Sequence, residues 1–182
     1  MHCNAQLKPL VIAALDTGFR KSELLSLRWG NIDSRTRLIT VEAACTKTGE
    51  ARSVSMTRRL TATLRELKMG GVDDPTASVF RYRYVTKTFS RAVTRAGIPD
   101  FTFHDLRHTF ASRLIMGGVD LPTVKELMGH KHITMTLRYA HLAPGHKRSA
   151  IEVLDRIGEK VPAIFTTGGR AVESPLPQVF EK

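Results

Sequence analysis

The sequence has little cysteine and no long apolar run. Its 182 residues contain two cysteines, Cys3 and Cys45, which are too few for a disulfide framework or a four-cysteine zinc site. No apolar stretch approaches the roughly 18 to 20 residues that a membrane helix needs. The first ten residues also lack the basic and then apolar order of a secretory signal. We therefore expect a cytoplasmic protein that has no membrane partner and binds no metal through cysteine.

Acidic residues are also scarce relative to basic ones. The chain carries 28 Lys and Arg against 17 Asp and Glu, a formal net charge of +11. Residues 159–182 hold three basic and three acidic residues, so the whole excess lies in residues 1–158. A basic folded domain attracts polyanions, above all nucleic acid, because binding releases condensed counterions. A ribosomal-type protein or another basic enzyme would carry the same charge, so charge alone leaves the partner open.

Apolar periodicity and turn residues predict a mainly helical fold with a small antiparallel β-sheet, an α+β class. Two predicted strands, 37–43 and 51–56, form a hairpin around the turn 46–50. The predicted helices are 7–18, 22–30, 57–68, 85–97, 102–118, 121–130, 133–142 and 146–158. Gly18 and Gly129 are expected to end two of them. Residues 159–182 mix Gly, Pro, Ser and Thr without periodicity, which predicts a flexible tail.

The predicted helix over 102–118 has two different faces. Thr102 and Asp105 fit a capping box at its start. One face is apolar and is expected to be buried: Phe103, Leu106, Phe110 and Leu114. The adjacent face carries His104, Arg107 and His108 at positions i, i+3 and i+4. The planar guanidinium of an arginine binds two non-bridging oxygens of a phosphodiester at once, so His104 and Arg107 suit phosphoryl chemistry.

Four segments of the chain form a pattern when they are taken in order. They are TGFRKSELLSLRW (17–29), TKTGEAR (46–52), HDLRHTFASRL (104–114) and LMGHKHITMTLRYAHL (127–142). Together they closely resemble the catalytic domain of the tyrosine recombinases, the phage integrase family. The resemblance runs from about Leu7 to about Leu142 and implies the fold of the DNA breaking–rejoining enzymes. It places a catalytic domain over residues 1–158. Such recombinases carry a helical core-binding domain on the N-terminal side, which we expect to be absent from this chain.

The resemblance also implies which residues are catalytic. Six positions match the family pattern: Arg20 in TGxR, Lys47 on the hairpin turn, His104 and Arg107 in HxxR, His130 in LMGH, and Tyr139 as the nucleophile. All six carry the residue type that the family requires, so the resemblance indicates an active enzyme.

These residue types suit an attack by tyrosine on phosphorus. A phenol with a pKa near 10 is mostly neutral at pH 7, so Tyr139 needs a proton acceptor, and His104 is the expected one. Arg20 and Arg107 would bind the non-bridging oxygens of the transition state, and His130 would donate a further hydrogen bond. Two fixed cations of this kind can replace a metal.

The leaving 5′ oxygen needs a proton, and Lys47 is the expected general acid. The resemblance implies a 3′-phosphotyrosyl intermediate at Tyr139, which conserves the energy of the phosphodiester, so that rejoining needs no cofactor. Water must not attack this intermediate. We therefore interpret the two nearest acids as structural, Asp105 as a cap partner and Glu23 as the partner of a nearby arginine.

Other activities remain in competition with recombination. His104 and His108 have the i, i+4 spacing of a zinc-binding helix, but the glutamate of that motif is missing and Arg107 would repel a dication, so no metal is expected. A DNA-binding module without chemistry, a metal-dependent nuclease and a type IB topoisomerase are the alternatives. The LMGH and YAH segments favour the integrase.

The expected partner is double-stranded DNA. Lys87, Arg91 and Arg95 on the predicted helix 85–97 either contact the DNA backbone or form a solvated face. The segment 146–158 resembles the element that such recombinases dock onto a neighbouring protomer, although it would pack equally well on its own domain. The resemblance thus implies a homo-tetramer on DNA and a monomer when the domain is isolated.

Overall fold

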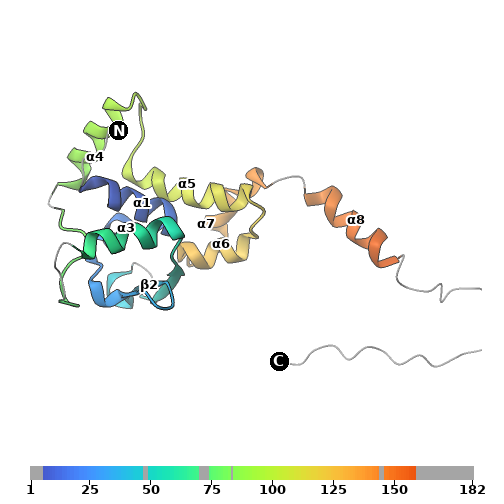
Figure 1. Ribbon diagram of the computed structural model, residues 1–182. Coiled ribbons are helices and arrows are strands. Elements are labelled where there is room, and N and C mark those ends of the chain that lie inside the picture. The colour runs from blue at the N-terminus through green and yellow to red at the C-terminus, as the bar shows by residue number, and fades with distance from the viewer. Residues whose placement is uncertain (1–5, 47–48, 70–73, 83, 144–145, 159–182) are drawn as a thin grey trace, which may run out of the picture. The chain divides into compact units, whose positions relative to one another are not determined.

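A computed structural model describes residues 6–46, 49–69, 74–82, 84–143 and 146–158 (Figure 1). The chain forms two compact units, Met1–Pro144 and Gly145–Lys182. Over the described residues the fold is mainly helical with one three-stranded antiparallel sheet, so the predicted fold class is confirmed. The predicted tail, 159–182, lies outside the described residues, and the domain boundary at residue 158 stays a prediction.

The first unit is built around helix α1. Its α-helices are α1 (Leu7–Thr17), α2 (Lys21–Ser26), α3 (Arg58–Lys68), α4 (Val85–Arg95), α5 (Phe103–Met116), α6 (Leu121–Met128) and α7 (Thr134–Leu137). Helix α1 packs against α2, α3, α4 and α5, and Figure 1 shows it between α3 and α5. One of its faces is fully buried, with Leu7, Leu10, Ala13 and Ala14 each at most 1% exposed, and Val11, Ile12 and Leu15 are partly buried beside it.

The sheet has the order β1-β2-β3, with strands β1 (Ile32–Asp33), β2 (Leu38–Val41) and β3 (Arg52–Ser55). The predicted hairpin is therefore present, with Ile39 opposite Val54 and Val41 opposite Arg52. Ile39, Val41 and Val54 are buried and join the core of the first unit. The turn between β2 and β3 contains Lys47, which lies outside the described residues.

The predicted helix 22–30 is wrong beyond Ser26. Helix α2 ends there, and the chain then runs extended at Leu27 and Arg28 before a 3-10 turn over Trp29–Asn31. The backbone at Leu27 and Trp29 hydrogen-bonds to Val79 and Ala77, at 2.9 and 3.1 Å. These long-range backbone bonds replace the helical ones, so tertiary contacts override the local helical pattern.

The C-terminal elements also differ from the prediction. The expected helix 133–142 is two short pieces, α7 and a 3-10 turn over Ala140–Leu142, and Tyr139 lies between them. Helix α8 (His146–Gly158) belongs to the second unit, and its apolar Ile151, Leu154 and Ile157 are 53–61% exposed. Over the residues that the structure describes, no helix has the length and apolarity to cross a bilayer.

Gly18 joins α1 to the turn that carries Arg20. It ends α1 with a φ of 63°, a left-handed conformation that costs other residues free energy. A Cβ at Gly18 would also lie 2.3 Å from a ring carbon of Phe110 on α5. Because glycine has no side chain, the end of α1 can pack closely against Phe110 of α5.

We expect Gly18→Ala to lower the free energy of unfolding by about 2–4 kcal/mol, because it adds backbone strain and an overlap with Phe110. Gly97→Ala is the matched control, since Gly97 has a φ of 68° and nothing within 4 Å of the added Cβ. That control should lose about 1 kcal/mol. Urea denaturation of both variants measures the difference, and equal losses would show that the contact with Phe110 is unimportant.

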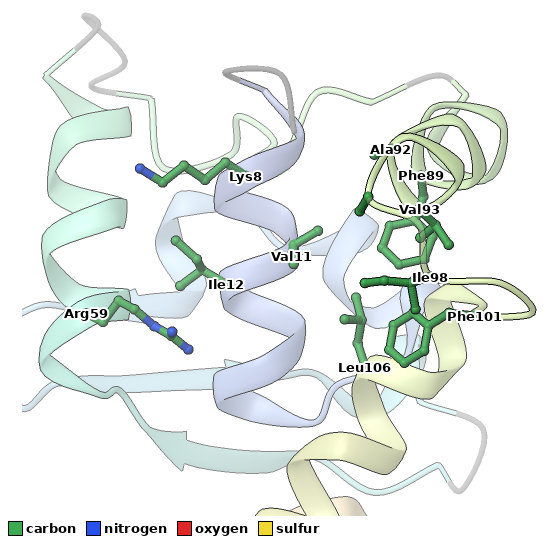
Figure 2. A pocket seen from close by; sticks show the side chains of 11 residues that line it. Lys8, Val11, Ile12, Arg59, Phe89, Ala92, Val93, Ile98, Phe101 and Leu106 are labelled. Atoms are coloured by element: carbon green, nitrogen blue, oxygen red, sulfur yellow. The ribbon is translucent and has the colours of Figure 1, made fainter. Parts of the chain in front are cut away.

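An apolar hollow of about 520 Å³ lies beside α1 (Figure 2). Val11 and Ile12 of α1 line it together with Phe89 of α4, Phe101 and Leu106. Its lining contains no histidine, carboxylate, cysteine or tyrosine. Lys8 and Arg59 are the ionisable residues in its lining.

Candidate active site

A polar cleft of about 470 Å³ brings together residues that are far apart in the chain. Its lining comes from the α1–α2 turn, from α5, and from the segment between the end of α6 and Tyr139: Arg20, His104, Arg107, His108, Met128, His130, Thr134, Met135, Arg138 and Tyr139. Five of the six predicted catalytic residues are in this group. The sixth, Lys47, lies outside the described residues.

Arg107 joins the three parts of the cleft. Its side chain is buried, Nη1 donates to the carbonyl oxygen of Gly18 at 2.5 Å, and Nη2 donates to that of Met128. Both carbonyls lie at the C-terminal ends of helices, where the helix dipole favours a cation. Burial, followed by repulsion from Arg20 and Arg52, lowers the pKa of Arg107 to about 9, so it remains charged at pH 7. The tight hydrogen bonding fixes this charge in place.

Arg20 is held by a buried carboxylate. The Arg20 backbone N–H donates to Glu23 Oε2 at 2.7 Å, and its Nη1 donates to Oε1 at 2.8 Å. Arg52 donates to the same two oxygens, from Nη1 to Oε1 at 3.1 Å and from Nη2 to Oε2 at 2.6 Å. Burial alone would raise the pKa of Glu23, but the bonds from Arg52 and Arg20 outweigh it and lower that pKa. Glu23 is thus the partner of an arginine, as expected.

Arg52 is a supporting residue that the sequence analysis did not single out. It lies on β3, its Nε donates to the carbonyl of Leu127 at 3.3 Å, and its guanidinium lies 4.9 Å from the centre of the Phe19 ring. It connects the hairpin that carries Lys47 to Glu23 and to the end of α6. The sequence signal available for Arg52 was its position as the last residue of the TKTGEAR segment.

His130 follows Gly129, which ends α6 with a φ of 60°. The His130 side chain is buried, and its Nδ1 lies 2.9 Å from the hydroxyl oxygen of Thr136. Burial, followed by repulsion from Arg107 and Arg20, lowers the pKa of His130 to about 4, so the ring is neutral at pH 7. When the Thr136 hydroxyl donates to Nδ1, the proton is on Nε2, and that N–H is available to a bound phosphate.

Tyr139 is buried, with 5% of its surface exposed, and its ring packs in an apolar cluster. The cluster consists of Phe110, Ala111, Ile115, Val124, Met128 and Tyr139. Its hydroxyl lines the cleft and lies 2.5 Å from Nδ1 of His108. Burial raises the pKa of Tyr139, and Arg138 and Arg107 partly offset that rise. The phenol is therefore neutral at pH 7.

The hydroxyl of Tyr139 thus contacts His108, whereas His104 was expected to accept its proton. His104 lines the same cleft, and its ring packs edge-on against His108 with 4.8 Å between ring centres. Burial, followed by Arg107, lowers the pKa of His104. The sequence signal for His108 was its position one turn after His104, in HDLRH.

The family model described as the phage integrase family matches residues 3–146. The chain belongs to the phage integrase family. The integrase of Salmonella phage P22 is 34% identical over 177 residues, covering 88% of this chain and 46% of the phage protein. A XerC-like tyrosine recombinase of Caldanaerobacter subterraneus subsp. tengcongensis is 31% identical over 192 residues, covering 82% of this chain and 49% of that protein. The chain spans about half the length of these curated relatives.

Two solved structures have the same fold as this chain. The catalytic domain of bacteriophage HP1 integrase superposes with a TM-score of 0.66 at 33% identity, and the match covers 82% of each chain. An integrase of the transposon Tn1549, in complex with transposon right end DNA, has a TM-score of 0.67 at 22% identity, covering 84% of this chain and 59% of that one. The predicted integrase-like fold is thereby confirmed.

The three residues predicted to contact DNA do not line the cleft. Lys87, Arg91 and Arg95 are exposed and follow one another at four-residue intervals along α4, which places them on one face. Their contact with DNA stays a prediction. Among the described residues, no three His, Cys, Asp or Glu side chains gather as a metal site requires.

Proposed function

We propose that this chain is the catalytic domain of a site-specific DNA recombinase that cuts and rejoins DNA without a metal or a cofactor. The observation that carries the proposal is the cleft itself. It holds the Tyr139 hydroxyl together with the guanidiniums of Arg20 and Arg107 and three imidazoles, all from one compact unit. A nucleophile and fixed cations in one pocket suit attack on a phosphodiester.

Two cations and one neutral imidazole bind the scissile phosphate. Arg20, Arg107 and the Nε2–H of His130 donate to its non-bridging oxygens, where negative charge increases in the transition state. Each group is already held in place: Arg20 by Glu23, Arg107 by two helix-end carbonyls, and His130 by Thr136. Because these groups are held before DNA binds, little reorganisation is needed during the reaction.

Tyr139 attacks phosphorus, the bond from phosphorus to the 5′ oxygen breaks, and the products are a 3′-phosphotyrosyl bond and a 5′-hydroxyl. Lys47 is proposed to protonate the leaving oxygen. Glu23 is engaged by two arginines and Asp105 by Thr102, so neither carboxylate is available to activate water against the intermediate. This supports rejoining over hydrolysis.

The proposed partners are double-stranded DNA and further copies of this chain, assembled as a homo-tetramer on DNA from monomers in free solution. The exposed apolar residues of α8, Ile151, Leu154 and Ile157, support docking onto a neighbouring protomer. The Tn1549 relative, which is in complex with DNA, supports the DNA partner. The proposed location is the cytoplasm, where chromosomal and phage DNA are available to such an enzyme.

A trapping assay tests the proposed activity. The chain is incubated in EDTA with a pool of nicked duplexes that have a randomised centre, and adducts that survive SDS are isolated and sequenced. We expect a covalent adduct. Mass spectrometry of its peptides should locate the attached nucleotides on the peptide that contains Tyr139. DNA binding without an adduct would indicate a binding module, and cleavage only without EDTA would indicate a metal-dependent nuclease. Relaxation of plasmids without joining of two selected duplexes would indicate a topoisomerase.

The salt dependence of DNA binding tests the contact by α4. Log K falls with log salt by about 0.9 for each phosphate neutralised. Replacing Lys87, Arg91 and Arg95 with alanine should therefore reduce the slope by about 0.9 for each side chain that contacts a phosphate. The control replaces Arg58, Arg65 and Lys68 of α3 with alanine. It removes the same charge from exposed side chains of another helix. Equal slopes for the two triple variants would show that α4 presents a solvated face.

A further inference from the structure

His108 is in direct contact with the atom that reacts. Its Nδ1 lies 2.5 Å from the Tyr139 hydroxyl oxygen, and the two ring centres are 5.9 Å apart. It immediately follows the buried Arg107 on α5, so its backbone position is fixed by the hydrogen bonds that hold Arg107. Among the described residues that match the family pattern, Arg20, His104, Arg107 and His130 make no such contact with the Tyr139 hydroxyl.

We propose that His108, rather than His104, is the base that takes the phenolic proton when Tyr139 attacks phosphorus. The inference rests on the proposed function and assigns one step of its reaction. The Tyr139 hydroxyl donates to Nδ1, which requires the ring proton of His108 to be on Nε2. A base must lie within hydrogen-bond distance of the proton that it removes, and His108 meets that condition in this structure.

Every proton in the cleavage and rejoining steps is accounted for. In cleavage, the proton on the Tyr139 oxygen moves to His108 Nδ1, the oxygen bonds to phosphorus, and the bond to the 5′ oxygen breaks. That oxygen takes a proton from the general acid, for which Lys47 is proposed. In rejoining, the 5′-hydroxyl returns its proton to the acid and attacks phosphorus. The phenolate leaves and recovers its proton from His108, so no net proton or electron is consumed.

The charges around His108 keep it neutral before the reaction. Burial lowers its pKa, and His104 and Arg138 lower it further, followed by a smaller contribution from Arg107. Asp105 acts in the opposite direction and raises it. The other ionisable groups in the cleft are Arg20 from the α1–α2 turn, His130 after α6, and Tyr139 itself. A neutral imidazole accepts a proton at pH 7 and returns it readily, because the imidazolium lies among cations.

His104 has a different environment. It is more exposed than His108, and the edge of one ring meets the face of the other, with 4.8 Å between ring centres. Its position in the cleft suits contact with the phosphate, and its ring supports the orientation of His108. The two histidines therefore have separate roles, which their variants should distinguish.

Single-turnover cleavage of a nicked duplex selected by the trapping assay tests the inference. His108→Ala and His108→Asn should each cleave at least about 10²-fold more slowly than the wild type. Asparagine places an amide oxygen near the position of Nδ1, so it keeps a hydrogen bond to Tyr139 but accepts no proton. His141→Ala, which removes an exposed histidine outside the cleft, should stay within about twofold. Thermal unfolding of each variant checks its folding.

Three further readouts separate a base from a residue that only positions Tyr139. The wild-type rate should fall as the pH drops through the pKa of His108, because the imidazolium accepts no proton. This acid limb should disappear in His108→Ala and persist in His104→Ala. Added imidazole should restore cleavage by His108→Ala but not by His104→Ala. A duplex with a 5′-bridging sulfur, whose thiolate leaves without a proton, should restore Lys47→Ala and leave His108→Ala slow.

The outcomes that overturn the inference are distinct from failure of the proposed function. A wild-type adduct together with normal cleavage by His108→Asn would show that the hydrogen bond alone matters. Imidazole rescue of His104→Ala in place of His108→Ala would reassign the base to His104. If the wild type forms no adduct at all, the proposed function fails, and the inference fails with it.

Discussion

The Tyr139→Phe variant is expected to form no covalent adduct with any DNA in the randomised pool. The substitution removes only the hydroxyl oxygen, which is the single atom proposed to bond to phosphorus. The ring stays in its apolar cluster with Phe110 and Ile115, so the fold should be retained. Loss of the hydrogen bond to His108 should cost about 0.5–1.5 kcal/mol of unfolding free energy. SDS-resistant adducts and urea denaturation measure the two effects.

Tyr84→Phe is the matched control for this prediction. It removes a phenolic oxygen from a side chain that is 65% exposed and that does not line the cleft. It should form adducts at the wild-type rate. DNA affinity should be similar for the wild type and both variants, because no cation is removed. An adduct that persists in Tyr139→Phe would show that another residue is the nucleophile.

The second large effect is expected at Glu23. Glu23→Gln should lower the free energy of unfolding by about 2–4 kcal/mol, since it leaves Arg20 and Arg52 close together without the buried charge between them. The value is below that of a fully buried pair because the Arg20 side chain is 19% exposed. Cleavage should also fall, because Arg20 loses the carboxylate that orients it. Glu66→Gln, an exposed change on α3, is the control.

The pH dependence of stability checks the same carboxylate. Folding lowers the pKa of Glu23 below its ordinary value of 4.5. The stabilisation from its charge is therefore complete above pH 4.5 and is lost as the pH falls through the folded-state pKa. Glu23→Gln should lose this part of the acid dependence, whereas Glu66→Gln should keep it. Parallel acid profiles for the wild type and Glu23→Gln would contradict the assignment.

Elements whose signals are local were predictable. Gly18 and Gly129 end helices with positive φ, and Thr102 and Asp105 form the expected capping box at the start of α5. The hairpin was visible from β-forming residues on both sides of a polar turn. By contrast, the helix predicted over 22–30 stops at Ser26, because residues 77–79 supply its backbone bonds from about 50 positions away.

The site was predictable in its residues but not in its contacts. The order of the four segments located Arg20, His104, Arg107, His130 and Tyr139, and all five line one cleft. Helical periodicity placed Arg107 on a polar face beside His104, whereas its side chain is buried against Gly18 and Met128. A buried arginine requires carbonyl acceptors, and these come from the ends of two other helices. No spacing within α5 could reveal them.

Local chemistry in the chain was therefore sufficient to establish several helix ends, the basic character of residues 1–158 and the residue types available for phosphoryl transfer. The pairing of those residues depended on folding. Arg107 and Gly18 are 89 positions apart, and His108 and Tyr139 are 31 apart. The first contact forms where the end of α1 packs on α5, and the second where the segment after α7 packs on α5. The partner of the proposed nucleophile therefore depends on how these segments pack, and periodicity within a single helix does not encode it.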